Sequence, residues 1–374
     1  MSNRGRIPFT ELFERCQNEI IRDKAQNDAS EYKYKGVINE VYLSDYMGYL
    51  SEDYLRTQAY ITTTADYSSG TITVAAAGAT ITGVSTAWTS ANSDDSLFKA
   101  NAGAGTYRVT YTAGTTLTLA QPSAWVDDAV SAGSYRLIHD RYALASDFGH
   151  MVIDSQSAPE AVYWQSSGNP CFLIPMDNGL YDQKVSFTHA TPNYYTVKYV
   201  YGVPYIYISP ADTTSRAIFY NYIPELEPMT EYTTGTASCT TATTAVTGTG
   251  TQWAGYIDTN LEYYLRFDGD GTGSESKWYK INTTSGLAAA TITLSDTYGG
   301  ATKSSAAYTI SMVSRWPTRY DSPMIYGAAL RIDPEATGAQ RWASHYASAL
   351  NLQLSADGRA IQGTHGAYKR RPNV

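Results

Sequence analysis

The chain has 374 residues, of which 43% are hydrophobic and 17% are charged, and its formal net charge is −8. This length exceeds what a single hydrophobic core usually serves, so the sequence predicts more than one domain. The acidic balance argues against a protein whose main task is to grip phosphate groups.

The N-terminal part shows helical periodicity. Apolar side chains recur there at spacings of four, three and four positions, as Phe9, Phe13, Cys16 and Ile20. This spacing places them on one face of a helix, which we expect to pack into a core. A second helical stretch is predicted over residues 34–50, so residues 1–69 are expected to form the N-terminal helical part of a host domain.

A duplicated motif lies in two separated parts of the chain. The second copy repeats residues of the first copy 165 positions later. The shared residues are Gly70-Thr71, Thr82-Gly83, Thr86 and Trp88 in the first copy and Gly235-Thr236, Thr247-Gly248, Thr251 and Trp253 in the second. Both copies consist of short runs rich in Thr, Val and Ile between glycine-containing turns, which predicts short strands. We therefore expect two homologous domains inserted into the host, over residues 70–138 (the first insert) and 235–312 (the second insert), each a small antiparallel β-sandwich or barrel.

The tryptophan that each insert carries at the same place in the motif allows two interpretations. Trp88 and Trp253 are predicted to be core residues, because tryptophan is highly buried on average. Alternatively, both indoles lie on the surface and bind glycans. The two interpretations differ in the expected exposure of the rings.

Residues 139–234, between the inserts, have the alternation of β-strands. Large side chains occupy alternate positions over 197–201 and 205–207, and a further strand-like run follows over 216–222. Turn residues separate the three runs. We expect three consecutive strands joined by short turns, which is an antiparallel β meander in the host.

Two helix starts follow the second insert. Asp321-Ser322-Pro323 and Asp333-Pro334 each combine a capping residue with a proline in the first helical turn. The second predicted helix carries large side chains at helical spacing, namely Trp342, Tyr346 and Leu350. Residues 313–358 are therefore predicted to form a C-terminal helical hairpin of the host.

The last segment, residues 359–374, is basic and contains no acidic residue. Its basic side chains and apolar anchors are Arg359, Lys369, Arg370, Arg371, Ile361 and Tyr368. A segment of this composition cannot fold alone, so it is either a solvated terminus or an arm that becomes ordered on a partner. As an arm, it would dock on an acidic groove of a neighbouring subunit.

Sequence motifs for catalysis and cofactor binding are absent. The five histidines and three cysteines lack the spacing of a zinc site or a disulfide framework, and no glycine loop has the context of a phosphate-binding loop. Asp268 and Asp270 imitate the first half of a calcium loop, but Tyr279 stands at the twelfth position, where such a loop needs Glu. We expect a non-enzymatic protein without catalytic residues, cofactor or metal, and leave calcium at Asp268 and Asp270 open.

Several segments together are similar to one protein family. Residues 141–148 read Arg-Tyr-Ala-Leu-Ala-Ser-Asp-Phe, which resembles a Tyr-x-Leu-Pro-x-Asp-Phe pattern with Ala145 in place of the proline. The strand-like run 202–222 and the helical runs 326–330 and 340–350 add to the similarity. The chain thus resembles the head-to-tail adaptor (connector or neck) proteins of tailed bacteriophages.

This resemblance implies an α+β fold, in which a helical-bundle adaptor core with an antiparallel β meander carries the two inserts. It implies a structural virion protein at the head-tail junction, where about 12 copies form a homo-oligomeric ring under the portal protein. The tail over 359–374 would dock on the portal, and the inserts would meet tail, nozzle or fibre proteins. During genome ejection, DNA would pass through the acidic channel without sequence-specific binding.

Two other functions stay open at this stage. One is another neck or tail ring, or a fibre-anchoring protein. The other is a carbohydrate-binding or receptor-binding tail protein that uses Trp88 and Trp253. We expect synthesis in the host cytoplasm and no membrane contact, because no apolar segment follows residues 1–8 and no run reaches membrane-spanning length.

Overall fold

The structure is a computed structural model and describes residues 6–23, 31–45, 55–101, 105–152, 161–184, 190–270 and 277–348. The chain forms two compact units. One is Arg56–Glu225, and the other combines Met1–Leu55 with Leu226–Val374. Each unit contains one of the inserts, and both ends of the chain belong to the same unit.

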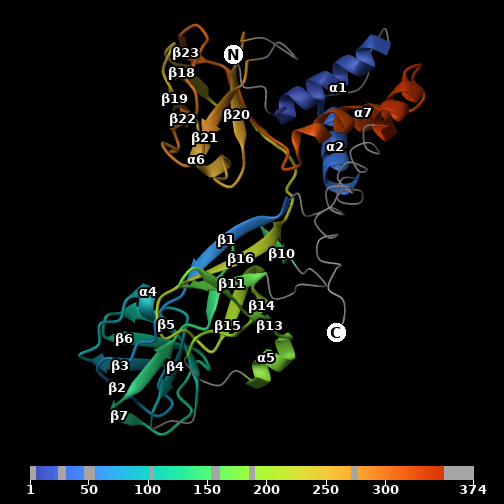
Figure 1. The fold of residues 1–374 in the computed structure, drawn as a ribbon. Helices are drawn as coiled ribbons and strands as arrows, with labels where there is room; N and C mark the ends of the chain where they lie inside the picture. Colours follow the sequence, from blue (N-terminus) through green and yellow to red (C-terminus); the bar gives the residue numbers. More distant parts are fainter. Residues whose placement is uncertain are drawn as a thin grey trace, which may run out of the picture. The chain divides into compact units, whose positions relative to one another are not determined.

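The first insert is an antiparallel sheet within the unit Arg56–Glu225 (Figure 1). Its described strands pair in the order β7-β2-β3-β6-β5-β4-β8. The bounds are β2 (Thr71–Val74), β3 (Thr80–Val84), α4 (Ser90–Ser93), β4 (Ser96–Ala100), β5 (Tyr107–Ala113), β6 (Thr116–Gln121), β7 (Val130–Gly133) and β8 (Tyr135–Ile138). Along β3, buried and exposed residues alternate, so one side of the strand faces a core of aliphatic and aromatic side chains.

The second insert repeats this topology. Its described strands pair in the order β23-β18-β19-β22-β21-β20-β24, which matches the first insert strand by strand, and β17 continues the sheet beyond β24. The bounds are β17 (Glu231–Tyr232), β18 (Thr236–Cys239), β19 (Ala245–Thr249), α6 (Trp253–Tyr256), β20 (Tyr263–Phe267), β21 (Tyr279–Asn282), β22 (Thr291–Leu294), β23 (Lys303–Ala306) and β24 (Tyr308–Met312). The duplication seen in the sequence is therefore a duplicated three-dimensional domain.

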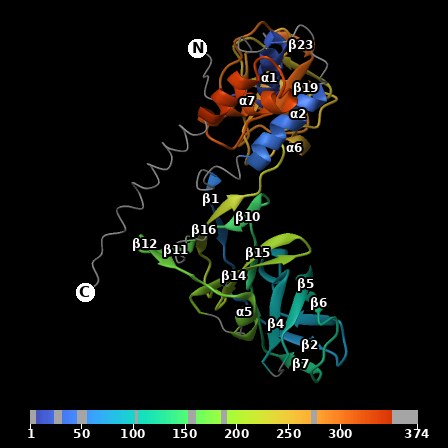
Figure 2. The same ribbon diagram turned by 90° about the vertical axis from the view of Figure 1, so that its right-hand side faces the viewer.

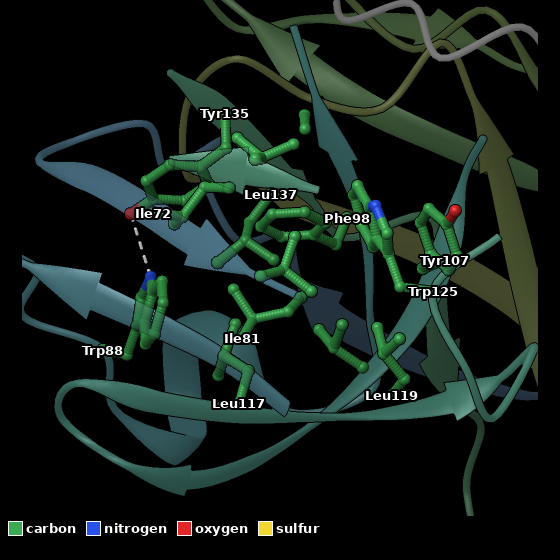
Figure 3. Packing of buried hydrophobic residues seen from close by; sticks show 14 residues of the cluster. Ile72, Ile81, Trp88, Phe98, Tyr107, Leu117, Leu119, Trp125, Tyr135 and Leu137 are labelled. Carbon is green, nitrogen blue, oxygen red and sulfur yellow. Dashed lines mark hydrogen bonds between the residues drawn. The ribbon is translucent and has the colours of Figure 1, made fainter. Parts of the chain in front are cut away.

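The same chain of hydrogen bonds crosses the core of both inserts. In the first insert, Trp88 Nε1 donates to Tyr135 Oη at 2.9 Å (Figure 3), and this hydroxyl donates to the Ser69 backbone carbonyl at 2.7 Å. In the second insert, Trp253 Nε1 donates to Tyr308 Oη at 2.8 Å, and this hydroxyl donates to a backbone carbonyl at 2.6 Å. Because an unpaired polar group in a core costs stability, these bonds allow both ring systems to be buried.

A glycine lies directly against each tryptophan ring. A Cβ atom at Gly83 would stand 2.3 Å from Thr86 Oγ1 and 2.8 Å from Trp88 Cη2. In the second insert, a Cβ atom at Gly248 would stand 2.4 Å and 2.8 Å from the corresponding threonine and tryptophan atoms. The repeated Thr-Gly-x-x-Thr-x-Trp pattern therefore reflects packing, since only glycine leaves room for the edge of the ring.

The rest of the unit Arg56–Glu225 is a sandwich of two sheets (Figure 2). The β16 sheet has the order β1 (Thr57–Thr62), β16 (Ala217–Pro224), β11 (Val162–Ser166) and β12 (Asn169–Phe172), and β10 (Phe148–Met151) also pairs with β16. The β15 sheet has the order β13 (Ile174–Pro175), β14 (Tyr194–Val200), β15 (Val203–Ser209) and β9 (Arg141–Ala143); α5 spans Asn178–Lys184. Side chains of both sheets, among them Ile61, Ile218, Ile206 and Ile208, form one shared core.

The predicted meander over residues 139–234 is wrong. β14 and β15 form a hairpin, but β16 pairs with β1, β11 and β10 in the opposite sheet. Residues 210–216 connect the two sheets. Alternation in the sequence predicts strands but not their partners, and here the apolar sides of β15 and β16 are buried by facing each other across the core.

The longer described helices belong to the unit that contains both chain ends. α1 (Phe9–Asp23), α2 (Glu31–Glu40), η1 (Val41–Asp45) and α7 (Asp321–Ile332) contact one another, and η5 (Thr318–Tyr320) precedes α7. Residues 339–348 are also helical, and residues 333–338 connect them to α7. This connection is longer than the sequence predicted, because the helix does not begin at Asp333-Pro334.

The predicted helical-bundle core is also wrong. The structure is 40% strand and 21% helix, and its described residues form several antiparallel sheets and no helical-bundle core. The reason is that α1 packs on the second insert as well as on the other helices. Thr10 N donates to Ser311 Oγ of β24 at 2.9 Å, and Arg266 of β20 binds both carboxylate oxygens of Glu14 at 3.0 and 2.7 Å.

We expect Gly248→Ala to destabilise the second insert by about 2 kcal/mol, because the added methyl group overlaps Thr251 and the Trp253 ring and overpacking carries costs of this order. Urea unfolding followed by tryptophan fluorescence measures the effect. Gly255→Ala is the matched control, since a Cβ atom there meets no atom within 4 Å. Equal losses of stability in the two variants would contradict the packing role of Gly248.

Candidate protein-binding surface

The structure places Trp88 and Trp253 inside their inserts. Their exposed fractions are 2% and 0%. Each indole donates to a buried tyrosine hydroxyl. Burial raises the pKa of Tyr308 to about 12, and it also raises the pKa of Tyr135. The two phenols therefore stay protonated near neutral pH, and neither indole is available to stack on a saccharide.

The predicted helix-packing residues lie in the interior where the structure describes them. The four apolar residues of α1 and Trp342 are buried. Tyr346 is half-buried and packs against α7, where a Cβ atom at Gly327 would stand 2.9 Å from its ring. The remaining candidates lie outside the described residues, and they are Leu350, Arg359, Ile361, Tyr368, Lys369, Arg370 and Arg371.

The acidic residues of the calcium-like turn face a lysine. Lys303 Nζ donates to the Asp268 carbonyl oxygen at 2.9 Å and forms an ion pair with Asp270 Oδ1 at 3.2 Å. Tyr298 Oη donates to the other oxygen of Asp270 at 2.8 Å. An ammonium group thus already compensates the Asp270 charge. Within the described ranges, no cluster of three or more His, Cys, Asp or Glu side chains has the arrangement of a metal site.

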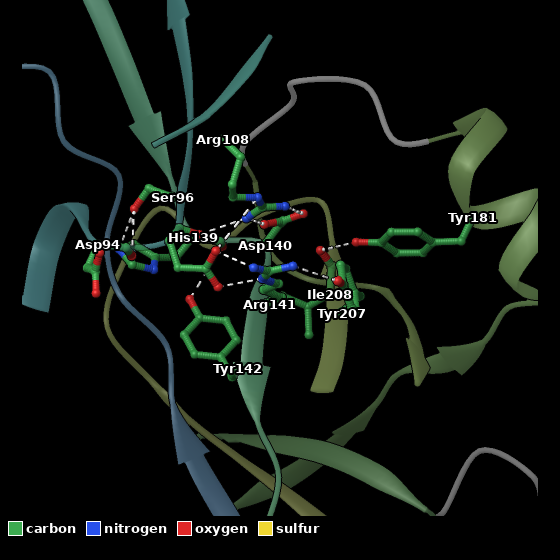
Figure 4. A network of polar contacts seen from close by, with 11 residues as sticks. Asp94, Ser96, Arg108, His139, Asp140, Arg141, Tyr142, Tyr181, Tyr207 and Ile208 are labelled. Carbon is green, nitrogen blue, oxygen red and sulfur yellow. Dashed lines mark hydrogen bonds and ion pairs between the residues drawn. The ribbon is translucent and has the colours of Figure 1, made fainter. Parts of the chain in front are cut away.

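One serine–histidine pair has the distance of a catalytic dyad but not its accessibility. Ser96 Oγ lies 2.7 Å from His139 Nε2 (Figure 4). The exposed fraction of Ser96 is 0%, so a substrate cannot reach the hydroxyl group. Burial lowers the pKa of His139, which favours the neutral ring. The pair is best explained as a packed contact of the first insert rather than as an activated nucleophile.

Two ion pairs next to this contact join the first insert to the β15 sheet. Arg108 of β5 binds Asp140 through two hydrogen bonds of 2.7 and 3.2 Å (Figure 4). Arg141 of β9 binds the carboxylate of Asp95 through Nε and Nη2, and it also donates to Tyr207 Oη at 3.1 Å. Bidentate arginine–carboxylate pairs fix orientation as well as distance, so they hold the insert in place on the sandwich.

The outer face of the β16 sheet carries a row of four aromatic rings, one from each of β1, β16, β11 and β12. The strand register pairs Tyr60 with Phe219, and it pairs Tyr163 with both Phe219 and Phe172. Ring centroids along the row are 5.9, 5.4 and 5.9 Å apart. The neighbouring rings stabilise the sheet, yet the two end rings remain exposed, Tyr60 by 63% and Phe172 by 42%.

Where the four strands pair, the other outward positions of this aromatic face are uncharged. They are Gln58, Thr62, Gln165, Pro170, Ala217 and Asn221. Gln58 Nε2 donates to Tyr163 Oη at 3.1 Å and to Asn221 Oδ1 at 3.3 Å. Depletion of charge together with enrichment in aromatic rings distinguishes the core of a protein–protein interface from the rest of a protein surface.

An open depression of about 480 Å³ lies at the β11–β12 end of the row. Its lining combines Tyr163 and Phe172 with a proline, three amide side chains and one guanidinium group, namely Pro170, Gln58, Gln165, Asn221 and Arg56. Ring surfaces offer contact to another aromatic group, the amides can bind a hydroxyl group, and the guanidinium can stack on a ring. The depression therefore suits an aromatic side chain with a polar end.

None of the described residues that the sequence predicts for a site lies on this face. A signal is present in the strands, because Tyr60 and Phe219 directly adjoin Ile61 and Ile218, which point to the core. That alternation shows which residues share a face of one strand. Only the cross-strand register shows that four aromatic residues, distant in sequence, form one row.

No protein-family model and no curated protein matches the sequence. Among solved structures, the chain has a weak similarity to translation elongation factor SelB from Methanococcus maripaludis, in complex with the GTP analogue GppNHp. The sequence identity is 10% and the TM-score is 0.16. The match covers 70% of this chain and 63% of that chain, and at this TM-score it supports no argument. In the part of the chain that the structure describes, no helix has the length and apolar character of a membrane span.

The acid that was predicted to cap α7 lies in a buried contact instead. Asp321 is the first residue of α7, is 2% exposed, and accepts a hydrogen bond from Ile7 N at 3.4 Å. Desolvation by burial raises the pKa of Asp321 to about 7. The charges of Arg6 and Arg15 oppose this rise, and the charge of Glu11 adds to it.

The pKa of Asp321 predicts how stability depends on pH. Because the folded chain holds this proton more tightly than the unfolded chain, the contribution of Asp321 to stability is lost as pH rises from 3.8 to about 7. Asp321→Asn should remove this dependence, which thermal melting across that range measures. Asp128→Asn, at an exposed position, is the control. A melting profile of Asp321→Asn that runs parallel to the wild type would contradict the raised pKa.

Proposed function

We propose that this chain is a non-enzymatic structural protein of a virion, the head-to-tail adaptor that forms a ring under the portal and joins it to the tail around a channel for DNA. The observation that carries the proposal is the uncharged aromatic face of the β16 sheet. Exposed apolar patches of this kind mark sites of protein interaction. A protein that works by assembly needs such a face, whereas a single-chain enzyme does not.

The composition of the aromatic face favours a protein partner over nucleic acid. A surface that grips DNA gathers Lys and Arg to neutralise phosphates. On this face Arg56 lies at the border and the described outward positions are uncharged. DNA enters the proposal only as a passing chain, which an acidic ring would not bind tightly.

The segment that resembles the adaptor pattern has a structural role that suits a sequence signature. Residues 141–148 run from the start of β9 to the start of β10 and form a corner of the sandwich. Leu144 and Phe148 belong to the shared core, and Tyr222 Oη donates to Asp147 Oδ1 at 2.7 Å. The leucine and the phenylalanine of the pattern thus pack in the core, and the aspartate accepts a hydrogen bond. These structural roles support the resemblance.

A carbohydrate-binding function through Trp88 and Trp253 is not part of this proposal. Both indoles are buried and hydrogen-bonded inside their inserts. Another neck or tail ring, or a fibre-anchoring protein, would use the same kind of interaction face. The choice among these assemblies is an outcome of the binding experiment.

We expect Phe172→Ser to weaken assembly of the full-length chain on its cognate portal ring. Loss of an aromatic anchor from an interface costs about 2 kcal/mol, which corresponds to roughly a 30-fold change in Kd. Co-sedimentation with the portal measures the effect, and native mass gives the stoichiometry. Val126→Ser is the matched control, because Val126 is 70% exposed in the first insert and lies outside the aromatic row.

The outcomes separate the candidate assemblies. Saturation near one chain per portal subunit, lost when residues 359–374 are deleted, is the result expected of an adaptor. No association at any salt concentration would overturn the adaptor and favour another neck, tail or fibre-anchoring position. Equal binding by Phe172→Ser and by wild type would remove the aromatic face as the basis of the proposal.

A further inference from the structure

The hairpin of β14 and β15 ends in an exposed aromatic tip. Tyr201 and Gly202 form its two-residue turn, with φ angles of 51° and 85°, and two positive φ angles are characteristic of a type I′ turn. Tyr201 is 96% exposed, and its neighbours Tyr199 and Val203 are 59% and 44% exposed. The hairpin therefore presents a phenol ring to solvent at the end of two paired strands.

Tyrosine is an unfavourable residue for this turn on local grounds. The first position of a type I′ turn favours Asn, Asp and Gly, and a bulky residue at positive φ is strained. In the described chain, the other non-glycine residues with positive φ have smaller side chains, namely Ala77, Ser85, Asp95, Ala132, Ser167, Ala242 and Ser305. The Tyr201 ring is almost fully exposed in its own chain. Burial of the ring therefore does not offset the backbone strain at this position.

The depression on the aromatic face has the chemistry to receive such a ring. Tyr163 and Phe172 lie edge to face with centroids 5.9 Å apart, and both line the depression. The Gln165 amide and the Arg56 guanidinium, which also line it, can bind the phenol hydroxyl or stack on the ring. The volume of about 480 Å³ is within the range of ordinary ligand pockets.

We propose that Tyr201 of one copy inserts into the depression beside Tyr163 and Phe172 of a second copy. The inference rests on the proposed assembly function and names the partner of its aromatic face. In the proposed assembly each copy uses its tip on one neighbour and its depression on another, which makes the contact heterologous. Repeated contacts of this type close into a ring when the rotation between neighbours allows it.

Charge favours a second copy as the occupant. The chain has a net charge of −8, so two copies repel one another wherever acidic surfaces meet. Residues 194–208 of the hairpin include no Asp or Glu. The described outward positions of the aromatic face include no Asp or Glu either, and Arg56 is the charged side chain that lines the depression. These two surfaces can therefore approach each other without bringing acidic side chains together.

The test is self-association of the full-length chain without portal, measured by native mass over a concentration series. Tyr201→Asn removes the ring and places the preferred Asn-Gly pair in the turn, so its melting temperature should not fall. Phe172→Asp places a charge in the depression. Gln165→Glu also places a negative charge in the depression, but at an exposed position and without changing the aromatic row. It replaces Phe172→Asp in the test if that variant fails to fold.

Wild type should form oligomers larger than dimers, and each single variant should lose them. A mixture of Tyr201→Asn with a depression variant should give one-to-one dimers and stop there, because only one intact tip and one intact depression can meet. A wild-type chain that stays monomeric, a Tyr201→Asn variant that assembles normally, or a mixture that stays monomeric would overturn the inference.

Portal binding distinguishes failure of this inference from failure of the proposed function. One outcome is that Tyr201→Asn binds the portal and self-associates as wild type does, while Phe172→Asp loses portal binding. The depression would then receive the portal protein. This result overturns the contact between copies but keeps the proposed adaptor function. If no variant and not even wild type binds the portal, the proposed function itself fails.

Discussion

In each insert, a buried indole N–H donates to a tyrosine hydroxyl, which in turn donates to a backbone carbonyl. This chain of bonds ties the loop after the second strand of the insert to its last long strand and to the segment that precedes its first strand. It also requires a residue without a side chain under the ring, which Gly83 and Gly248 provide. Because a large polar-tipped ring is only stable in a core when its N–H is satisfied, these few residues recur together and define the duplicated domain.

The first insert is self-contained, and this explains how the sandwich can carry it. The first insert has its own core and joins the host through paired charges, Arg108 with Asp140 and Arg141 with Asp95. The core between the two sheets buries the inner face of the β16 sheet. On the outer face of this sheet the end rings Tyr60 and Phe172 remain exposed, and the proposed function follows from that face.

Sequence reasoning succeeded where one element determines its own pattern. The spacing of Phe9, Phe13, Cys16 and Ile20 shows a helical face, and these residues are buried on α1. It failed where elements choose partners. Helical residues at the two ends suggested a bundle, but α1 packs also on β24. The run from 194 to 222 suggested one meander, but β16 lies in the opposite sheet from β14 and β15.

The sequence by itself determined the duplication, because the Thr-Gly-x-x-Thr-x-Trp pattern encodes contacts between residues close in the chain and repeats in full. It did not reveal β1, because residues 1–69 were predicted to be helical and Thr57–Thr62 form a strand. Only the tertiary structure decided which strands are neighbours, and therefore that Tyr60, Phe219, Tyr163 and Phe172 form one exposed row. The physical reason is that strand pairing is a non-local choice, made by the burial of whole faces and not by the propensity of any single segment.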